Sequence, residues 1–305
     1  MSALHGVLVT YRRPRHLANH LDALAGQSRT LDSLVVVDND PGQSARAVLA
    51  AHPLPGVSTD YLASGENLGP AGGIAAGMRH VLRTADDDDW IALFDDDDPP
   101  RTPELIGTLE EFGVRLRAND SGVGAVGLCG GRFDTARGRI VRVDDHELAG
   151  PVLSCGVAGN QLPMYSVHAV RSVGVFDEDL FFGFEELEYG LRMLRHGFRI
   201  YAHGGLWHRE REHHGRLNLE LRPDRRLGGL SWRRYYSLRN LIYILRGCGE
   251  NRTALWLAAI GLAKPLVNLP RRPLLALQTL RLNSRAVRDA YRGRMGRTIE
   301  PVPKP

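Results

Sequence analysis

Cysteine is scarce in this sequence of 305 residues, which contains Cys129, Cys155 and Cys248 and no Cys-x-x-Cys pair. Three cysteines do not make an even disulfide framework, so this usage argues against a secreted disulfide scaffold and fits a reducing compartment. The first residues, Met1–Arg13, also lack a basic stretch ahead of an apolar core. We therefore expect a cytoplasmic protein without a signal peptide.

Three further absences narrow the class of protein. The chain has no internal repeat of solenoid period. The apolar segment Ala254–Leu269 is interrupted by Lys264 and Pro265 and is too short to span a bilayer comfortably. The first turn after a predicted strand reads Thr-Tyr-Arg-Arg-Pro, without the glycines of a dinucleotide-binding fingerprint. These absences exclude a solenoid and argue against a membrane-spanning protein and a nicotinamide-dependent enzyme.

The composition is that of a folded globular protein, with 43% hydrophobic and 24% charged residues. The formal charge of +4 is distributed unevenly, because the acids cluster early and the arginines late. Predicted strands at 3–10, 33–38, 57–62 and 90–94 alternate with predicted helices at 14–27, 44–51 and 71–83. This alternation predicts an α/β fold with a doubly wound, mostly parallel sheet.

The strand-helix rhythm weakens after Gly122, and a helix is predicted at 185–196, ended by Gly197. A change of composition at 209–226 leads into a helical, arginine-rich region. We therefore predict two domains, a catalytic domain at 1–215 and a C-terminal helical region at 216–305. In doubly wound sheets ligands bind beyond the carboxyl ends of the strands. Four polar segments are expected to converge there: 10–13, 38–40, 66–73 and 95–98.

The chain contains two runs of four aspartates in different contexts. Asp86–Asp89 follows a predicted helix, whose C-terminal end disfavours acids, so we interpret it as a solvated loop. Asp95–Asp98 leaves a buried strand and is stopped by two prolines that cannot continue the ladder. Carboxylates fixed at a strand end suit Mg²⁺ or Mn²⁺, which also bind phosphates. The second run is the candidate metal site, and a solvated turn is the alternative.

The loop at 66–73 places glycines where a helix begins, so free N–H groups there can approach an anion. Tight packing of the helix on a strand is the alternative explanation for these glycines.

These motifs together resemble the inverting, metal-dependent glycosyltransferases of GT-A fold, family 2. Within that family the chain looks most like bacterial galactofuranosyltransferases and the related rhamnosyltransferases. The resemblance spans about residues 5–245, and the ordered set is more specific than any one motif. In chain order the motifs are Val9–Pro14, Val36–Asp40, Asn67–Gly73, Asp95–Asp97, Phe181–Arg192, Trp207-His208 and Tyr235–Asn240.

The resemblance implies a GT-A-type sheet with a C-terminal helical extension. It also implies transfer of a sugar, with galactofuranose favoured, from a nucleotide-diphosphate donor to a glycan or lipid-linked acceptor in cell-envelope glycan assembly. Mn²⁺ or Mg²⁺ is the implied cofactor. A nucleic acid is not expected as a partner. The implied catalytic base is Glu186. The implied donor-binding residues are Thr10, Arg13, Asp38, Asn67, Gly73, Asp95, Asp96 and Arg239, and the implied metal ligands are Asp95, Asp97 and His208.

Several alternatives stay open within this resemblance. Because the run has a fourth aspartate, the metal triad could be Asp95–Asp97 or Asp96–Asp98. We favour Asp95–Asp97, which begins directly after the strand. A surface or core histidine is the alternative for His208, and a helix-surface arginine paired with an acid is the alternative for Arg239. A rhamnosyltransferase with a deoxythymidine-diphosphate donor is the rival enzyme. A non-catalytic, cation-dependent membrane-binding module is the rival from another class.

Helical geometry favours Glu186 as the base over its neighbours. Leu187, Leu191 and Leu194 fall on one predicted core-facing stripe. The remaining charges, Glu185, Glu188 and Arg192, share the opposite side, where they can pair as surface charges. Glu186 lies at the edge of the apolar stripe, where partial desolvation raises the proton affinity of a carboxylate. An exposed glutamate in a first helical turn is the alternative.

The C-terminal region combines an apolar segment with many arginines. From Arg271 to Arg297 there are eight arginines and one acid, Asp289. This combination predicts attachment to an anionic membrane surface, on the inner face of the plasma membrane. A helix pair packed on the catalytic domain or in a dimer is the alternative.

Overall fold

The computed structural model describes residues 2–156, 162–217 and 232–301 and divides into two compact units. The first unit comprises Met1–Arg132, Val143–Glu178 and Glu186–Leu219. The second comprises Phe133–Arg142, Asp179–Glu185 and Glu220–Pro305. Two short segments from within the predicted catalytic domain therefore belong to the C-terminal unit. Of the predicted junction at 209–226, residues 218–226 lie outside the described residues.

An eight-stranded sheet forms the centre of the first unit, in the order β3-β2-β1-β4-β9-β5-β10-β8. The β1–β2, β2–β3, β1–β4 and β5–β10 pairs are parallel, whereas β9 runs antiparallel to both its neighbours and β8 runs antiparallel to β10. The predicted α/β fold with a mostly parallel sheet is confirmed. The strands are β1 Leu4–Thr10, β2 Ser33–Asp38, β3 Ser58–Ala63, β4 Trp90–Asp95, β5 Val123–Gly127, β8 Pro151–Ser154, β9 Met164–Ser166 and β10 Arg199–His203.

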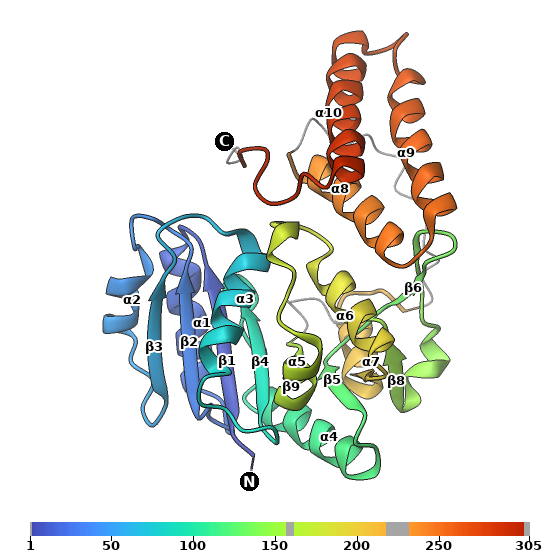
Figure 1. Ribbon diagram of the computed structural model, residues 1–305. Helices are drawn as coiled ribbons and strands as arrows, with labels where there is room; N and C mark the ends of the chain where they lie inside the picture. Colours follow the sequence, from blue (N-terminus) through green and yellow to red (C-terminus); the bar gives the residue numbers. More distant parts are fainter. Residues whose placement is uncertain (1, 157–161, 218–231, 302–305) are drawn as a thin grey trace. The chain divides into compact units, whose positions relative to one another are not determined.

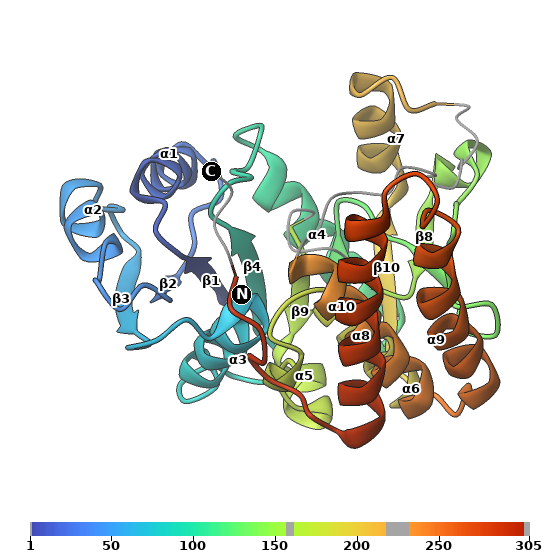
Figure 2. The same cartoon turned by 90° about the horizontal axis from the view of Figure 1, so that it is seen from above.

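Helices cover both faces of this sheet (Figure 2). One face packs against α1, α2 and α4, and the other against α3, α5 and α6. Alternate residues of a strand serve the two faces, as in β1, where Leu4 and Leu8 join one core and Val7 joins the other. The helices of this unit are α1 Pro14–Ala25, α2 Ala45–Ala51, α3 Gly69–Val81, α4 Leu105–Asn119, α5 Val167–Val173, α6 Glu185–Arg195 and α7 Gly204–His213, with a 3₁₀ turn at Asp145–Ala149.

The second unit is a helical bundle formed by α8 Trp232–Gly247, α9 Asn251–Leu266 and α10 Pro273–Arg292 (Figure 1). Its core includes Ile242, Leu245, Ala254, Ala258 and Ala290. The unit also contains most of the hairpin β6 Arg132–Asp134 and β7 Arg139–Val141, and the 3₁₀ turn Glu178–Leu180. Over the described ranges, none of the helices has both the length and the apolar character that a membrane crossing requires.

The predicted orientation of helix α6 is wrong. Leu191 is buried as predicted, but Leu194 is 36% exposed, and the fully buried residues are Tyr189 and Met193, so the buried face is shifted from the predicted leucine stripe. Glu185 and Glu188 are also buried rather than placed on the surface. Burial of Glu188 is possible because Arg192 pairs with it and also donates to the carbonyls of Val173 and Val175.

The solvated-loop interpretation of Asp86–Asp89 holds for the first three aspartates, which are exposed, and is wrong for the fourth. Asp89 is buried and accepts hydrogen bonds from the backbone N–H groups of Ala3 and Asp86. His5 lies 3.2 Å from its second oxygen. Burial favours the neutral acid, but these partners together hold the pKa of Asp89 below its ordinary value. Asp89 therefore ties the start of β1 to the start of β4.

Asp89→Asn tests this link. Because its pKa is depressed in the folded state, the ionised carboxylate stabilises the fold above the unfolded pKa, and this stability is lost as the pH falls through the folded pKa. We expect the variant to lose about 1–3 kcal/mol of unfolding free energy at pH 7, and less in acid. Urea unfolding at several pH values measures the loss. Asp88→Asn, at an exposed position of the same run, is the matched control, and an equal loss there would contradict the assignment.

Candidate active site

The strand order reverses between β1 and β4, which lie side by side while the chain continues outward from β1 to β2 and β3. Ligands of doubly wound sheets bind at such a reversal, beyond the carboxyl ends of the strands. Val9 of β1 pairs with Asp95 of β4, so the residues that follow each strand emerge together. The first turn after β1 and the acidic run after β4 therefore meet at the edge where a site is expected.

Asp96 is the anchor of this edge. It is 5% exposed and accepts a hydrogen bond from the Thr10 hydroxyl at 2.7 Å and another from Arg13 at 2.9 Å. The same guanidinium nitrogen donates to Asp97 at 2.6 Å. Thr10, Arg13, Asp96 and Asp97 are thus brought together as the sequence indicated, with Arg13 between two carboxylates.

Asp95 lies at the last position of β4 and faces an excess of negative charge. Burial, and then repulsion from Glu186 and from the three aspartates that follow, raise the pKa of Asp95 to about 7. Burial also raises the pKa of Asp96 despite Thr10 and Arg13. Such a set of carboxylates, short of positive partners, can accept a cation.

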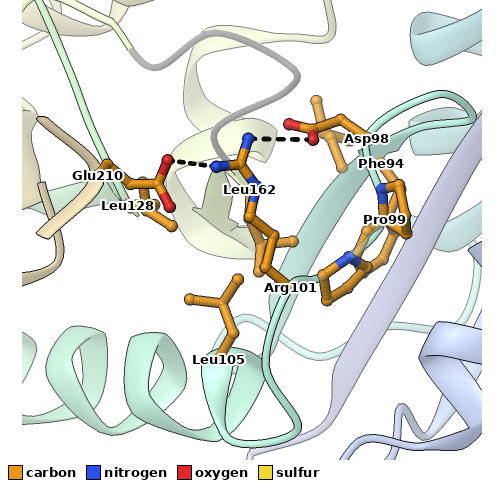
Figure 3. A pocket seen from close by; sticks show the side chains of 10 residues that line it. Phe94, Asp98, Pro99, Arg101, Leu105, Leu128, Leu162 and Glu210 are labelled. Atoms are coloured by element: carbon orange, nitrogen blue, oxygen red, sulfur yellow. Dashed lines mark hydrogen bonds and ion pairs between the residues drawn. The ribbon is translucent and has the colours of Figure 1, made fainter. Parts of the chain in front are cut away.

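Asp98 has a different partner from the other three acids. Arg101 extends between Asp98 and Glu210 of α7, and all three line a hollow beside β4 (Figure 3). The Arg101 guanidinium lies 2.6 Å from the Glu210 carboxylate and 3.5 Å from that of Asp98. Asp98 thus pairs with Arg101, whereas Asp96 and Asp97 pair with Arg13, and the register Asp95–Asp97 for a metal triad stays a prediction.

The residues predicted to surround the nucleoside form the neighbouring loops. Asp38 is fully buried and accepts hydrogen bonds from the N–H groups of Asp40 and Ala45 and from the Tyr61 hydroxyl, so it orders the loop after β2. Asn67 accepts from Gly69 N–H at the start of α3. A Cβ on Gly73 would lie 2.6 Å from Val9, so this glycine allows α3 to pack closely on β1.

Glu186 lies in the first turn of α6 and is half-buried. The backbone next to it is tightly packed, since a Cβ on Gly156 would lie 2.9 Å from the Glu186 carbonyl oxygen. Four residues further along α6, a Cβ on Gly190 would lie 1.9 Å from the Cys155 carbonyl oxygen. The segment at 155–156 therefore runs directly against α6, and the charge of Glu186 contributes to the raised pKa of Asp95.

The metal ligands predicted from the sequence come from two elements, the acidic turn and α7. Asp97 is exposed, and His208 is half-buried on α7 next to the buried Trp207. Across residues 2–156, 162–217 and 232–301, no three His, Cys, Asp or Glu side chains are grouped closely enough to hold a metal ion. The acidic residues still fit a hard divalent cation, because the charge of a cation would offset the repulsion that Asp95 receives from Glu186 and the neighbouring aspartates. A role for His208 as the additional ligand stays a prediction.

Arg239, predicted to contact the donor diphosphate, is fully buried on α8. Each of its five N–H donors has an acceptor within the second unit, so none is left for a diphosphate. The alternative of a helix-surface arginine does not describe it either. The acceptors are the Asn240 side chain, the Thr298 hydroxyl and the carbonyls of Asp179, Leu180 and Gly296.

Two residues of this region carry contacts that the sequence analysis did not assign. Arg101 could have been noticed as the first cation after the acidic run and its two prolines. Asn39 could not, because it donates to the Gly69 carbonyl across 30 residues of chain, which no local pattern reveals.

Residues 7–127 match the family model described as glycosyl transferase family 2. Two curated proteins are 45% identical to segments of this chain, the galactofuranosyltransferases GlfT1 of Mycobacterium tuberculosis and of Mycolicibacterium smegmatis. The first match covers 109 residues, 35% of this chain and 34% of the relative. The second covers 103 residues, 34% of this chain and 32% of the relative. The matched segment thus spans about a third of the length of these relatives.

Two solved structures share the fold. Mannosyltransferase PcManGT from Pyrobaculum calidifontis, in complex with GDP-Man and Mn²⁺, aligns with a TM-score of 0.51 at 16% identity. That alignment covers 94% of this chain and 86% of the other. GalNAc-T7 with UDP, GalNAc and Mn²⁺ aligns with a TM-score of 0.56 at 11% identity, over 81% of this chain and 48% of the other. The predicted GT-A type of fold is confirmed.

Proposed function

We propose, from the match of residues 7–127 to the glycosyl transferase family 2 model, that the protein transfers a sugar from a nucleotide-diphosphate donor to an acceptor hydroxyl with inversion. The observation that carries the proposal is the meeting of Thr10, Arg13 and the acidic turn at the point where the strand order reverses. This edge can bind both the cation and the nucleotide that such a transfer requires.

The loops of this edge bind the donor in the proposed complex. Asp38 and Asn67 hold the loops beside the nucleoside, and the start of α3 approaches the diphosphate with backbone N–H groups. Asp95 and Asp97, together with His208, would hold Mn²⁺ or Mg²⁺. The bound cation supplies positive charge that stabilises the departing nucleoside diphosphate. Arg13 keeps Asp96 and Asp97 in place through its two ion pairs.

Glu186 acts as the general base in this proposal. It is half-buried at the start of α6, and its charge acts on Asp95 of the acidic turn, so it lies within electrostatic reach of the proposed donor site. A carboxylate in such a position can accept the acceptor proton. The acceptor oxygen attacks the anomeric carbon as Glu186 takes its proton, and the diphosphate leaves from the opposite side, which inverts the configuration. The displacement needs a single step and no covalent enzyme intermediate.

Uridine-diphosphate-galactofuranose is the donor that we favour, since the curated relatives are galactofuranosyltransferases. Deoxythymidine-diphosphate-rhamnose is the alternative. Donor hydrolysis across a panel of nucleotide sugars with Mn²⁺ distinguishes the two. The acceptor in this proposal is a glycan or a lipid-linked glycan of the cell envelope.

The choice between the two acidic runs can be tested by metal-dependent binding of nucleoside diphosphate. Asp97→Ala removes a proposed ligand at an exposed position, so we expect binding in the presence of Mn²⁺ to be abolished. Asp88→Ala, in the other run and also exposed, should leave binding intact. Calorimetric titration with and without Mn²⁺ measures both. If both variants lose binding equally, or if neither loses it, the assignment of the metal site to Asp95–Asp97 is contradicted. Binding that does not depend on the metal contradicts both the metal-dependent enzyme and the cation-dependent module.

Glu186→Gln tests the base. The substitution keeps the shape of the side chain and removes its ability to accept a proton, so transfer should fall by roughly 10²-fold or more, with donor binding retained. Initial rates and donor titration measure the two effects. Glu185→Gln, at the adjacent position, is the comparison variant. Normal turnover in Glu186→Gln with loss in Glu185→Gln would move the role to the neighbouring residue, and a non-catalytic module predicts no dependence on either.

We further propose that helices α9 and α10 attach the protein to an anionic membrane surface. The segment from 251 to 288 contains six arginines and one lysine and no acid. Apolar side chains are exposed along it, including Trp256 at 64% and Leu274 at 77%. Exposed apolar residues among cations complement a bilayer with anionic headgroups. A second copy would bring the same positive charges against one another, so a dimer is the less favourable occupant.

Sedimentation with phosphatidylserine vesicles tests this surface. The full-length protein should sediment at low salt and less at high salt, because ionic screening weakens the attraction of its arginines. Trp256→Ala should reduce the bound fraction. Ile140→Ala, which truncates a side chain of similar exposure outside α9 and α10, should not. Absence of sedimentation at low salt, or equal reduction by the two variants, contradicts the proposal.

A further inference from the structure

The motif Tyr235–Asn240 has no part in the proposed donor site, yet its last two residues are fully buried and richly bonded. Both belong to α8 in the second unit. Their partners lie about 60 residues earlier, in the segment Asp179–Glu185 of the same unit. The chain then continues directly from Glu185 into Glu186, the proposed base.

The backbone of this segment is strained. Phe181 has φ of 61°, Gly183 has 86° and Phe184 has 68°. Glycine adopts such values freely, but two phenylalanines do not, because the Cβ approaches the backbone carbonyl oxygen. Left-handed non-glycine residues persist only where surrounding contacts hold them, and they gather at functional positions. The segment needs an external partner to keep this conformation.

Asn240 is that partner. Its side-chain amide donates to three carbonyls of the segment, those of Leu180 at 3.0 Å, Phe182 at 3.0 Å and Gly183 at 2.8 Å. The amide oxygen in turn accepts from the Arg239 Nε–H at 2.9 Å, which fixes the orientation of the amide. A single planar group thus sets the direction of three carbonyls around the strained residues.

Arg239 extends the same contacts to the end of the chain. It donates to Leu180 and Asp179 on one side and to Gly296 and Thr298 on the other. Gly296 N–H donates directly to the Asp179 carbonyl at 2.6 Å. The rings of Tyr235 and Tyr236 lie against the guanidinium, which carries its charge among carbonyl dipoles and aromatic faces. The segment before Glu186 is therefore held from α8 and from the C-terminal strap at 296–299.

We propose that Asn240 and Arg239 are positioning residues that hold Asp179–Phe184 in its strained conformation and thereby fix where helix α6 begins and where Glu186 stands. The catalytic part of this inference rests on the proposed role of Glu186. Loss of the three carbonyl contacts allows the left-handed phenylalanines to relax, and the start of α6 moves with them. A displacement of about 1 Å at a catalytic group can cost about 10²-fold in rate.

Asn240→Asp tests the inference, because it keeps the shape and replaces the donating amide with an acceptor. Asn283→Asp is the matched control, since Asn283 is also a buried asparagine of the second unit that donates to a backbone carbonyl, that of Gly261. Two quantities are measured: chymotryptic cleavage after Phe181, Phe182 and Phe184, and kcat and donor KM for transfer. In Asn240→Asp we expect cleavage at least about tenfold faster and kcat about 10–100-fold lower, with donor KM nearly unchanged.

Each outcome has a distinct meaning. Unchanged cleavage in Asn240→Asp, or equal acceleration in Asn283→Asp, overturns the holding role. Faster cleavage with unchanged kcat overturns the positioning role. If the wild type transfers no sugar, the proposed function has failed, and the cleavage comparison still decides whether Asn240 holds the segment. If Asn240→Asp does not fold, Asn240→Leu takes its place, because it removes the donors without adding a charge. Rapid cleavage of the folded wild type at Phe181, Phe182 or Phe184 also overturns the inference.

Discussion

Repulsion among carboxylates at the end of β4 is the constraint on which the site depends. Four consecutive aspartates leave a buried strand, where water cannot fully screen them. Different surroundings offset each charge: Thr10 and Arg13 at Asp96, Arg13 and solvent at Asp97, and Arg101 at Asp98. Burial first, and then repulsion from Glu186 and the neighbouring aspartates, raise the pKa of Asp95 to about 7. The loops after β1 and β4 have to approach each other to supply these partners, so the electrostatics and the topology select the same edge of the sheet.

The two aspartate runs show how context assigns opposite roles to one composition. In the first run, the three exposed acids face solvent and Asp87 also pairs with Arg171, whereas the buried Asp89 is stabilised by two backbone N–H groups and His5. Those contacts make it a structural link between two strands. In the second run, the stabilising groups are the Thr10 hydroxyl and the arginines Arg13 and Arg101, which lie beyond the strand ends. The neighbouring residues distinguish the two runs in the sequence. Asp86–Asp89 follows the end of a helix, whereas Asp95–Asp98 follows a strand and is followed by two prolines.

Local periodicity was sufficient to predict the order of the first strands and helices, because each of them packs its own apolar residues on the sheet. The convergence of Thr10, Arg13 and the acidic turn also followed from the sequence, since the carboxyl ends of parallel strands share one edge. The orientation of α6 did not follow. Its buried face includes Glu188, whose partner Arg192 is held by the carbonyls of Val173 and Val175, and such carbonyl contacts leave no mark in the composition of a helix.

The same limit applies to the motif that ends in Arg239 and Asn240. Along the chain it stands apart from Phe181–Glu186, and the family resemblance assigned its arginine to the donor diphosphate, a contact typical of arginine. In the fold its donors face backbone carbonyls, which every residue type carries, so no sequence pattern identifies the partner. The two motifs form one structural element. The strained segment needs hydrogen-bond donors that hold its carbonyls in place, and the buried donors of Arg239 and Asn240 need acceptors. Each motif therefore satisfies a requirement that the other could not meet alone, which explains why an arginine and an asparagine stand side by side, fully buried, in α8.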